Sequence, residues 1–152
     1  MPRFLGQYLH AIDDKGRVPL PAKLRNGGLD GSGNGVEAGG FYVAVRGTGG
    51  CLFLYQEEAF TVVLERLARL RRNGDPESRR RALAVTAQAA ELVLDKHGRL
   101  TLPQNLLDVA GLQREALFVG AADVIEIWNP GRFGDAMRVE DDEYDRFAAT
   151  VL

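Results

Sequence analysis

The sequence predicts a mainly β fold with flanking helices, of the α+β class and built from two repeated units. A stretch of 13 residues occurs twice, at 12–24 and at 94–106, and such a repeat indicates two copies of one supersecondary unit. Short apolar runs rich in β-branched and aromatic residues flank each copy, and such runs favour strands. Between the copies, residues 57–72 carry apolar side chains at helical spacing.

The two copies align at a constant shift of 82 residues. They read IDDKGRVPLPAKL and LDKHGRLTLPQNL, and the residues they share include Asp13 and Asp95, Gly16 and Gly98, Arg17 and Arg99, Leu20 and Leu102, and Pro21 and Pro103. An aspartate that opens a turn accepts hydrogen bonds from backbone amides two and three residues on, and glycine supplies the positive φ that follows. Turn geometry therefore explains Asp13, Gly16, Asp95 and Gly98, but it does not explain the arginines.

The first unit begins with a strand at 7–12, and the turn at 13–16 connects it as a hairpin to a strand at 17–20. Pro21 suits the first residue of a short helix at 22–25, and a glycine-rich loop follows at 26–40. Two strands then form a second hairpin at 41–46 and 51–55. The second unit repeats this order, with a helix at 103–110 ended by Gly111 and strands at 116–120 and 124–128.

A helical hairpin that covers the sheet is expected between the units. After the helix at 57–72, Asp75 and Pro76 form a strong helix start, an N-cap followed by proline, and the second helix extends to about Thr86. Its arginine run at 79–81 fits a solvated face or an intersubunit contact better than a phosphate site. We therefore divide the chain into a first unit (7–58), a helical connector (59–88), a second unit (89–132) and an acidic tail (133–152), which forms a short surface helix or a mobile end.

Composition limits the classes of function. The single cysteine, Cys51, excludes an intramolecular disulfide framework and cysteine-rich zinc modules. The N-terminus lacks a signal-peptide pattern and no apolar run approaches the roughly 20 residues of a membrane span, so we expect a soluble cytoplasmic protein without membrane partners. The net charge of −2 divides into −4 for residues 135–152 and +2 for residues 1–134, and residues 1–25 alone carry +3. The basic charge is thus concentrated on the first copy of the repeat.

Catalytic and metal-binding patterns are missing from the sequence. His10 and His97 occupy unlike places, and no serine elbow, paired-histidine motif or Cys-x-x-Cys occurs. The glycine-rich run from Asp30 resembles the start of a calcium-binding loop, but its twelfth position is Phe41 and not glutamate, and no Gly-Lys-Ser/Thr follows that would bind phosphate. We therefore expect no enzyme activity, no cofactor and no metal site.

What remains is a repeated turn that presents cations. Arg17 follows Lys15 and Gly16, and Arg99 follows Lys96 and His97. An arginine fork can bind guanine O6 and N7 or clamp a phosphate, and a β-ribbon is narrow enough to enter the DNA major groove. The alternative for Arg17 is a surface ion pair with Asp13 or Asp14. A surface role is more strongly favoured for Arg99, because the positive charge around Arg99 is weaker. Spacing alone does not separate DNA from another anionic partner.

The duplicated D-x-x-G-R-(V/L)-x-L-P motif, with CLFLY before the first helix and IEIW after the second unit, resembles the MraZ family of bacterial transcription regulators of the AbrB-like swapped-hairpin class. The resemblance extends from Phe4 to Phe133. It implies a pseudo-symmetric β-barrel of two interleaved units, a ring-shaped homo-oligomer associated with the nucleoid, and repression through directly repeated boxes in the double-stranded promoter DNA of the division and cell-wall gene cluster. It places DNA recognition on the first copy, at Asp13, Lys15, Gly16 and Arg17, with Arg3 nearby as a phosphate contact.

Two other functions remain open beside this resemblance. One is an antitoxin-like AbrB-fold protein whose tail neutralises a protein partner, and the other is a purely structural assembly protein. The sequence also departs from the family pattern at Pro19, where Thr or Ser is more usual. Because proline lacks an amide donor, Pro19 is expected to lie in an edge strand.

Overall fold

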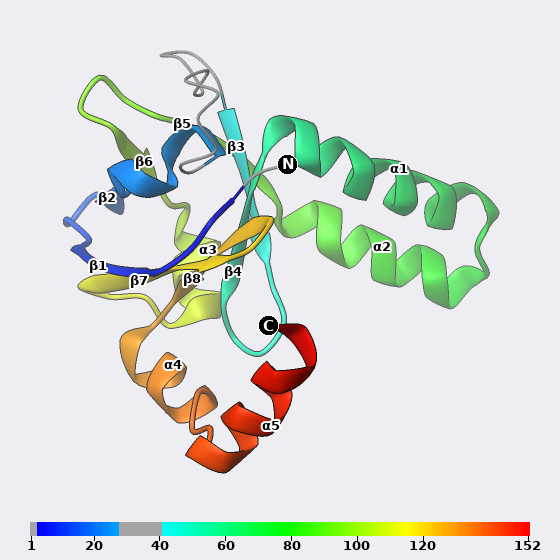
Figure 1. Ribbon diagram of the computed structural model, residues 1–152. Coiled ribbons are helices and arrows are strands. Elements are labelled where there is room, and N and C mark those ends of the chain that lie inside the picture. Colours follow the sequence, from blue (N-terminus) through cyan, green and yellow to red (C-terminus); the bar gives the residue numbers. More distant parts are fainter. Residues whose placement is uncertain (1–2, 28–40) are drawn as a thin grey trace.

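The computed structural model describes residues 3–27 and 41–152 and has a mixed α/β architecture (Figure 1). Its strands are β1 (Gln7–Ala11), β2 (Arg17–Pro19), β3 (Phe41–Arg46), β4 (Leu52–Gln56), β5 (Ala90–Val93), β6 (Arg99–Thr101), β7 (Glu115–Ala121) and β8 (Val124–Trp128). Its helices are a 3₁₀ helix (Ala22–Gly27), α1 (Glu57–Asn73), α2 (Pro76–Gln88), α3 (Gln104–Ala110), α4 (Pro130–Ala136) and α5 (Asp141–Val151). The predicted combination of sheet and flanking helices is confirmed.

Six strands form one antiparallel sheet in the order β1-β7-β8-β4-β3-β5. The two hairpins predicted from the sequence, β3–β4 and β7–β8, are present. The outer pairings connect the two units, because β1 pairs with β7 and β5 pairs with β3. The first strand of each unit thus extends the hairpin of the other unit, and β4 and β8 join the two hairpins at the centre.

The remaining two strands, β2 and β6, form a separate antiparallel ribbon. Arg17 lies opposite Thr101, Val18 opposite Leu100 and Pro19 opposite Arg99. The ribbon corrects one prediction, since the strands on either side of the turn at 13–16 do not pair with each other as a hairpin. Within the described residues β2 pairs with β6 alone, so Pro19 does lie in an edge strand. Its missing amide proton therefore costs no hydrogen bond between strands.

The closed β-barrel implied by the resemblance is not formed by the described residues. In that part of the chain the six-stranded sheet is open, with β1 and β5 at its edges, and the ribbon β2–β6 forms a second sheet. Apolar side chains from both sheets and from α3 fill the space between these elements. The largest fully buried ones include Leu20, Tyr42, Leu54, Leu100 and Phe118.

The helical hairpin predicted between the units is confirmed as α1 and α2. Asp75 caps α2 by accepting a hydrogen bond from the Ser78 amide at 2.8 Å, and Pro76 occupies the first turn. Figure 1 shows the hairpin extending away from the sheet, and only its base packs on β3 and β4, through Phe60 among others. The hairpin therefore projects from the sheet, although it was expected to cover it.

Two helices follow β8. The acidic end forms α5, which agrees with the surface helix that was one of the two alternatives. Helix α4 was not predicted, although Asn129 caps it through the amides of Gly131 and Arg132 and Pro130 follows at the first helical position. The predicted loop at 26–40 and its two ligand-binding alternatives lie outside the described residues over 28–40.

Candidate nucleic-acid interface

The ribbon β2–β6 places the two repeat arginines on one surface. Side chains alternate between the faces of a strand, and directly opposed residues of an antiparallel pair share a face. Val18 and Leu100, which oppose each other, are fully buried. Arg17 and Arg99 flank this pair and lie on the opposite, outward face, about a third exposed in each case. Two residues 82 positions apart in the sequence thus belong to a single basic surface.

The first turn holds Arg17 by its aspartate. Oδ1 of Asp13 accepts hydrogen bonds from the backbone amides of Lys15 (3.0 Å) and Arg17 (2.8 Å), and Oδ2 accepts one from Arg17 Nε (2.6 Å). The Arg17 amide is the main cause that lowers the pKa of the Asp13 carboxyl. Gly16 closes the turn at φ +78°, with its amide donating to the Asp13 carbonyl oxygen at 3.0 Å.

The second turn repeats the same contacts. Oδ1 of Asp95 accepts from the amides of His97 (2.8 Å) and Arg99 (2.9 Å), and Oδ2 accepts from Arg99 Nε (2.8 Å). These donors, the Arg99 amide first among them, lower the pKa of Asp95 from its ordinary 3.8 to about 2. Gly98 adopts φ +76°. In both copies the aspartate accepts the hydrogen bonds of the turn and the glycine supplies its positive φ.

The ion pairs use only one nitrogen of each guanidinium. Arg17 and Arg99 contact their aspartates through Nε, and over the described residues their terminal nitrogens have no acceptor. The pairing of Arg17 with Asp13, which the sequence left as an alternative to DNA contact, is thus present but leaves the fork of the guanidinium available. An arginine held at Nε presents its two terminal nitrogens in a fixed direction, which suits bidentate binding of a base or a phosphate.

The two turns differ in what supports them. Arg25 donates from Nε to the Leu20 carbonyl (2.9 Å) and from Nη2 to the Gly98 carbonyl (3.4 Å), so its guanidinium lies against the second turn. Its counterpart at the 82-residue shift is Leu107, a buried side chain that lies beside Gly16 of the first turn. Arg25 is a site residue that the repeat comparison missed, because it has no charged equivalent in the second copy. The sequence feature that could have indicated Arg25 is the concentration of cations in residues 1–25.

The other predicted cations are distributed unevenly. Lys15 and His97 are exposed at the tips of the two turns. Arg3 is exposed as well but lies beyond the opposite end of β1, since the next residue, Phe4, pairs with Ala122 in the turn between β7 and β8. The structure therefore brings Lys15, Arg17, His97 and Arg99 to the two ends of one ribbon and does not bring Arg3 there.

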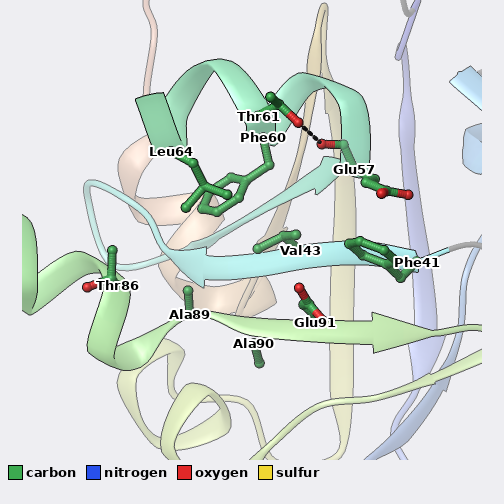
Figure 2. A pocket seen from close by; sticks show the side chains of 10 residues that line it. All are labelled: Phe41, Val43, Glu57, Phe60, Thr61, Leu64, Thr86, Ala89, Ala90 and Glu91. Atoms are coloured by element: carbon green, nitrogen blue, oxygen red, sulfur yellow. Dashed lines mark hydrogen bonds between the residues drawn. The ribbon is translucent and has the colours of Figure 1, made fainter. Parts of the chain in front are cut away.

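A separate hollow of about 300 Å³ lies at the base of the helical hairpin. Figure 2 shows Phe60 and Leu64 of α1 pointing across it toward Val43 of β3, with Glu57 and Glu91 at its border. It contains none of the residues predicted for the site. Within residues 3–27 and 41–152, no group of three or more candidate ligands could hold a metal ion and no helix has the length and apolar character of a membrane span.

Comparisons with known proteins match nearly the whole chain. Residues 3–81 and 85–150 match the family described as "MraZ protein, putative antitoxin-like". A protein named transcriptional regulator MraZ from Desulfitobacterium hafniense (strain Y51) is 34% identical over 149 residues, which cover 98% of this chain and 96% of the relative. A protein of the same name from Thermomicrobium roseum is 39% identical over 127 residues, which cover 84% of this chain and 82% of the relative.

Proposed function

The chain belongs to the MraZ family, and on this basis we propose that it is a sequence-specific DNA-binding transcription regulator, and not an enzyme. Its relatives carry the name transcriptional regulator. The observation that supports DNA as the ligand is the shared outward face of β2 and β6, where Arg17 and Arg99 stand on either side of the buried pair formed by Val18 and Leu100.

Arg17 is the proposed base-reading residue. Its terminal nitrogens can donate in parallel to O6 and N7 of a guanine, and one such bidentate pair discriminates against a wrong base by about 1–3 kcal/mol. The Asp13 carboxylate fixes the guanidinium at Nε before DNA arrives, so little side-chain entropy is lost on binding. Lys15, exposed at the tip of the turn, contacts phosphate in this proposal, and Gly16 supplies the positive φ of the turn that presents Lys15 and Arg17 to the DNA.

The second copy extends the same surface. Arg99 is held by Asp95 as Arg17 is held by Asp13, and His97 stands where the first copy has Lys15. We assign these residues to the flank of the same DNA segment, with Arg25 adding positive charge beneath the second turn. Arg3, at the other end of β1, contacts only phosphate farther along the duplex.

The proposed assembly is a homo-oligomer, a ring in which several ribbons face DNA. Each ribbon offers few base contacts, so affinity depends on docking several of them on directly repeated boxes at high effective concentration. The proposed target is the promoter of the division and cell-wall gene cluster, which the protein represses while associated with the nucleoid in the cytoplasm. Within one subunit we propose that the units 7–58 and 89–132 are related as swapped hairpins, with 59–88 as connector and 133–152 as tail; the exchange of β1 and β5 between the hairpins supports this relation.

A second function is favoured by one observation. The matched family is described as antitoxin-like, which fits an AbrB-fold protein whose acidic tail neutralises a protein partner. This function requires a toxin gene beside the gene for this chain, and a complex with its product that is lost when residues 135–152 are removed.

The test of DNA recognition is a gel-shift titration with the DNA upstream of the protein's own gene and with a shuffled duplex of equal length. We expect preference for the upstream DNA and a steep loss of affinity with salt, because cations displace counterions from phosphate. The Arg17→Ala variant should bind the upstream DNA at least about tenfold more weakly, the equivalent of one lost bidentate contact. Equal binding of both duplexes by the native chain contradicts sequence-specific recognition, and unchanged affinity of the variant contradicts the role of Arg17.

A further inference from the structure

Helix α5 has an exposed apolar stripe. Tyr144, Phe147 and Val151 recur at the spacing of one helix face, and they are 59%, 65% and 62% exposed. On the opposite side of the helix, Asp142 and Arg146 form an exposed ion pair. An amphipathic helix of 11 residues is marginal alone in water, because most helical stability in proteins comes from packing of the apolar face.

The α1–α2 hairpin has a groove that matches such a stripe. Leu64, Leu67 and Ala68 of α1 line it on one side and Ala82 and Leu83 of α2 on the other, around a hollow of about 180 Å³. Leu64 is 48% exposed and Leu83 39%. Two helices that project from the sheet cannot cover their own apolar seam, and a third helix laid along it would complete a small three-helix bundle.

Charge on the two surfaces is opposite. Residues 66–81 of the hairpin hold seven arginines against Asp75 and Glu77. In the described part of the chain Glu77 pairs with Arg80 and Arg81, whereas the other five arginines form no ion pair; they are Arg66, Arg69, Arg71, Arg72 and Arg79. On α5 acids border the apolar stripe, with Asp141 on one side and Glu143 on the other at helical spacing.

We propose that α5 of one subunit docks in the α1–α2 groove of a second subunit. Phe147 enters the hollow between Leu67 and Leu83, and Glu143, the acid next to Phe147 on the helix surface, faces Arg71, which borders the same groove. The proposal goes beyond DNA recognition and rests on the proposed homo-oligomer for its second subunit.

The helix that fills the groove comes from another subunit, because α5 is attached to a different side of its own subunit. Helix α4, which leads into it, is fastened to the body by Arg132, whose Nη1 donates to the carbonyl oxygens of Gly50 (3.2 Å) and Val109 (3.1 Å). Asn129 adds a bond to the Gly111 carbonyl at 2.7 Å. Residues 137–140 alone separate α4 from α5, and Figure 1 shows the hairpin projecting on another side of the sheet.

A contact of this size is an addition to an oligomer and does not by itself hold one together. A helix of 11 residues buries far less than the roughly 1,200–2,000 Å² of a stable protein interface. Within an oligomer the docking becomes an intramolecular event at high effective concentration, so a weak contact is occupied. Loss of the contact should therefore leave oligomers that form through other surfaces.

Disulfide trapping in the full chain tests the proposal. Phe147→Cys is combined in turn with Leu64→Cys, Leu67→Cys or Leu83→Cys, which together cover the length of the groove. A disulfide forms only when two Cα atoms approach within about 7 Å, so mild oxidation should give covalent dimers for at least one pair. Native chain, whose Cys51 is buried, and the Ala149→Cys variant on the far face of α5 should give none.

A matched pair of charge-reversal variants is then made in the double-cysteine variant that gives covalent dimers. Glu143→Lys, beside the stripe, should lower the yield of dimer about tenfold, the effect of about 1.4 kcal/mol, and Arg71→Glu should restore it. Asp142→Lys, on the far face, should leave the yield unchanged. If the substitution beside the stripe and the one on the far face of α5 lower the dimer yield equally, the proposed orientation of α5 is wrong.

The possible outcomes distinguish a failure of the α5 docking from a failure of the proposed homo-oligomer. A monomer by light scattering contradicts the homo-oligomer and the docking together. An oligomer that gives no interchain disulfide for any pair overturns the docking alone, and an intrachain disulfide overturns the assignment to a second subunit. Covalent dimers of the groove pairs, with neither control cross-linked, support it.

Discussion

Val18 lies directly opposite Leu100 in the ribbon β2–β6, and the two residues are each other's counterparts in the sequence repeat. The bonds on either side follow the same correspondence. The Leu20 amide donates to the Gly98 carbonyl at 3.0 Å, and the Leu102 amide donates to the Gly16 carbonyl at 2.9 Å. Each turn is therefore bonded to the strand that follows the other turn, and a change in one turn affects both units.

Gly16 should not tolerate a side chain. Its φ of +78° is unfavourable for other residues, and a Cβ there would lie 2.9 Å from the Leu102 carbonyl oxygen. We expect Gly16→Ala to lower the free energy of unfolding by about 1–3 kcal/mol, measured by urea denaturation. The control is Gly134→Ala in helix α4, where a Cβ meets nothing within 4 Å and alanine should stabilise the helix by up to about 1 kcal/mol. Similar effects of the two substitutions would contradict the strain assigned to the turn.

Arg99 should contribute to DNA binding because it shares the outward face of the ribbon with Arg17. We expect Arg99→Ala to weaken binding to the upstream DNA by about 1 kcal/mol or more, roughly fivefold, in a fluorescence anisotropy titration at fixed salt. Arg138→Ala removes an arginine of equal charge that pairs with Asp135 in the tail, and it should have little effect. If Arg99→Ala binds as Arg138→Ala does, DNA contact is confined to the first copy.

The carboxylate of Asp95 should make stability depend on pH in the acid range. Its pKa falls from 3.8 to about 2 on folding, so its charge stabilises the folded state above the unfolded pKa and stops doing so as pH falls through the folded one. We expect the urea midpoint of the native chain to exceed that of Asp95→Asn by a constant amount above about pH 5 and the difference to shrink between about pH 4 and pH 2. A difference that does not change with pH would mean that ionisation of the Asp95 carboxyl adds nothing to stability.

Cys51 should be chemically inert in the folded protein. Burial raises the pKa of its thiol to about 12, and the nearby Glu126 carboxylate adds to the effect. Because the thiolate is the reactive form, we expect no alkylation by iodoacetamide at pH 8 in the native state and complete alkylation in urea, followed by mass spectrometry. Cys51→Ala gives the background. Rapid alkylation without denaturant would show that the turn between β3 and β4 opens in the native state.

Local features of the fold could be predicted from the sequence because their causes are local. Asp75 and Pro76 start α2 by capping and by a fixed φ, and the two D-x-x-G turns close through bonds within five residues. The same reasoning would have found α4, since Asn129 and Pro130 repeat the start signal of α2. Its seven residues include Gly131 and Gly134, which have low helix propensity, so composition did not indicate a helix there.

Strand partners and the surroundings of the site were less predictable. Periodicity indicates that residues 7–11 form a strand but carries no information about its partner, and a strand before a tight turn is usually paired with the strand after it. Here β1 pairs with β7, and burial of both sheets against one core decides the matter. Arg25 was missed for a related reason, because its contact with the Gly98 turn spans 73 residues.

The exchange of edge strands has a consequence for synthesis of the chain. β1 is among the first segments to leave the ribosome, yet its partner β7 begins at Glu115. For most of translation β1 therefore has an unpaired edge. Leu9, a residue of β1 itself, is exposed even in the finished fold. Pairings so distant in sequence slow folding and extend the time during which unpaired strands can associate wrongly. An arrangement that fastens both turns to one ribbon thus delays completion of the first unit until the second has nearly been made.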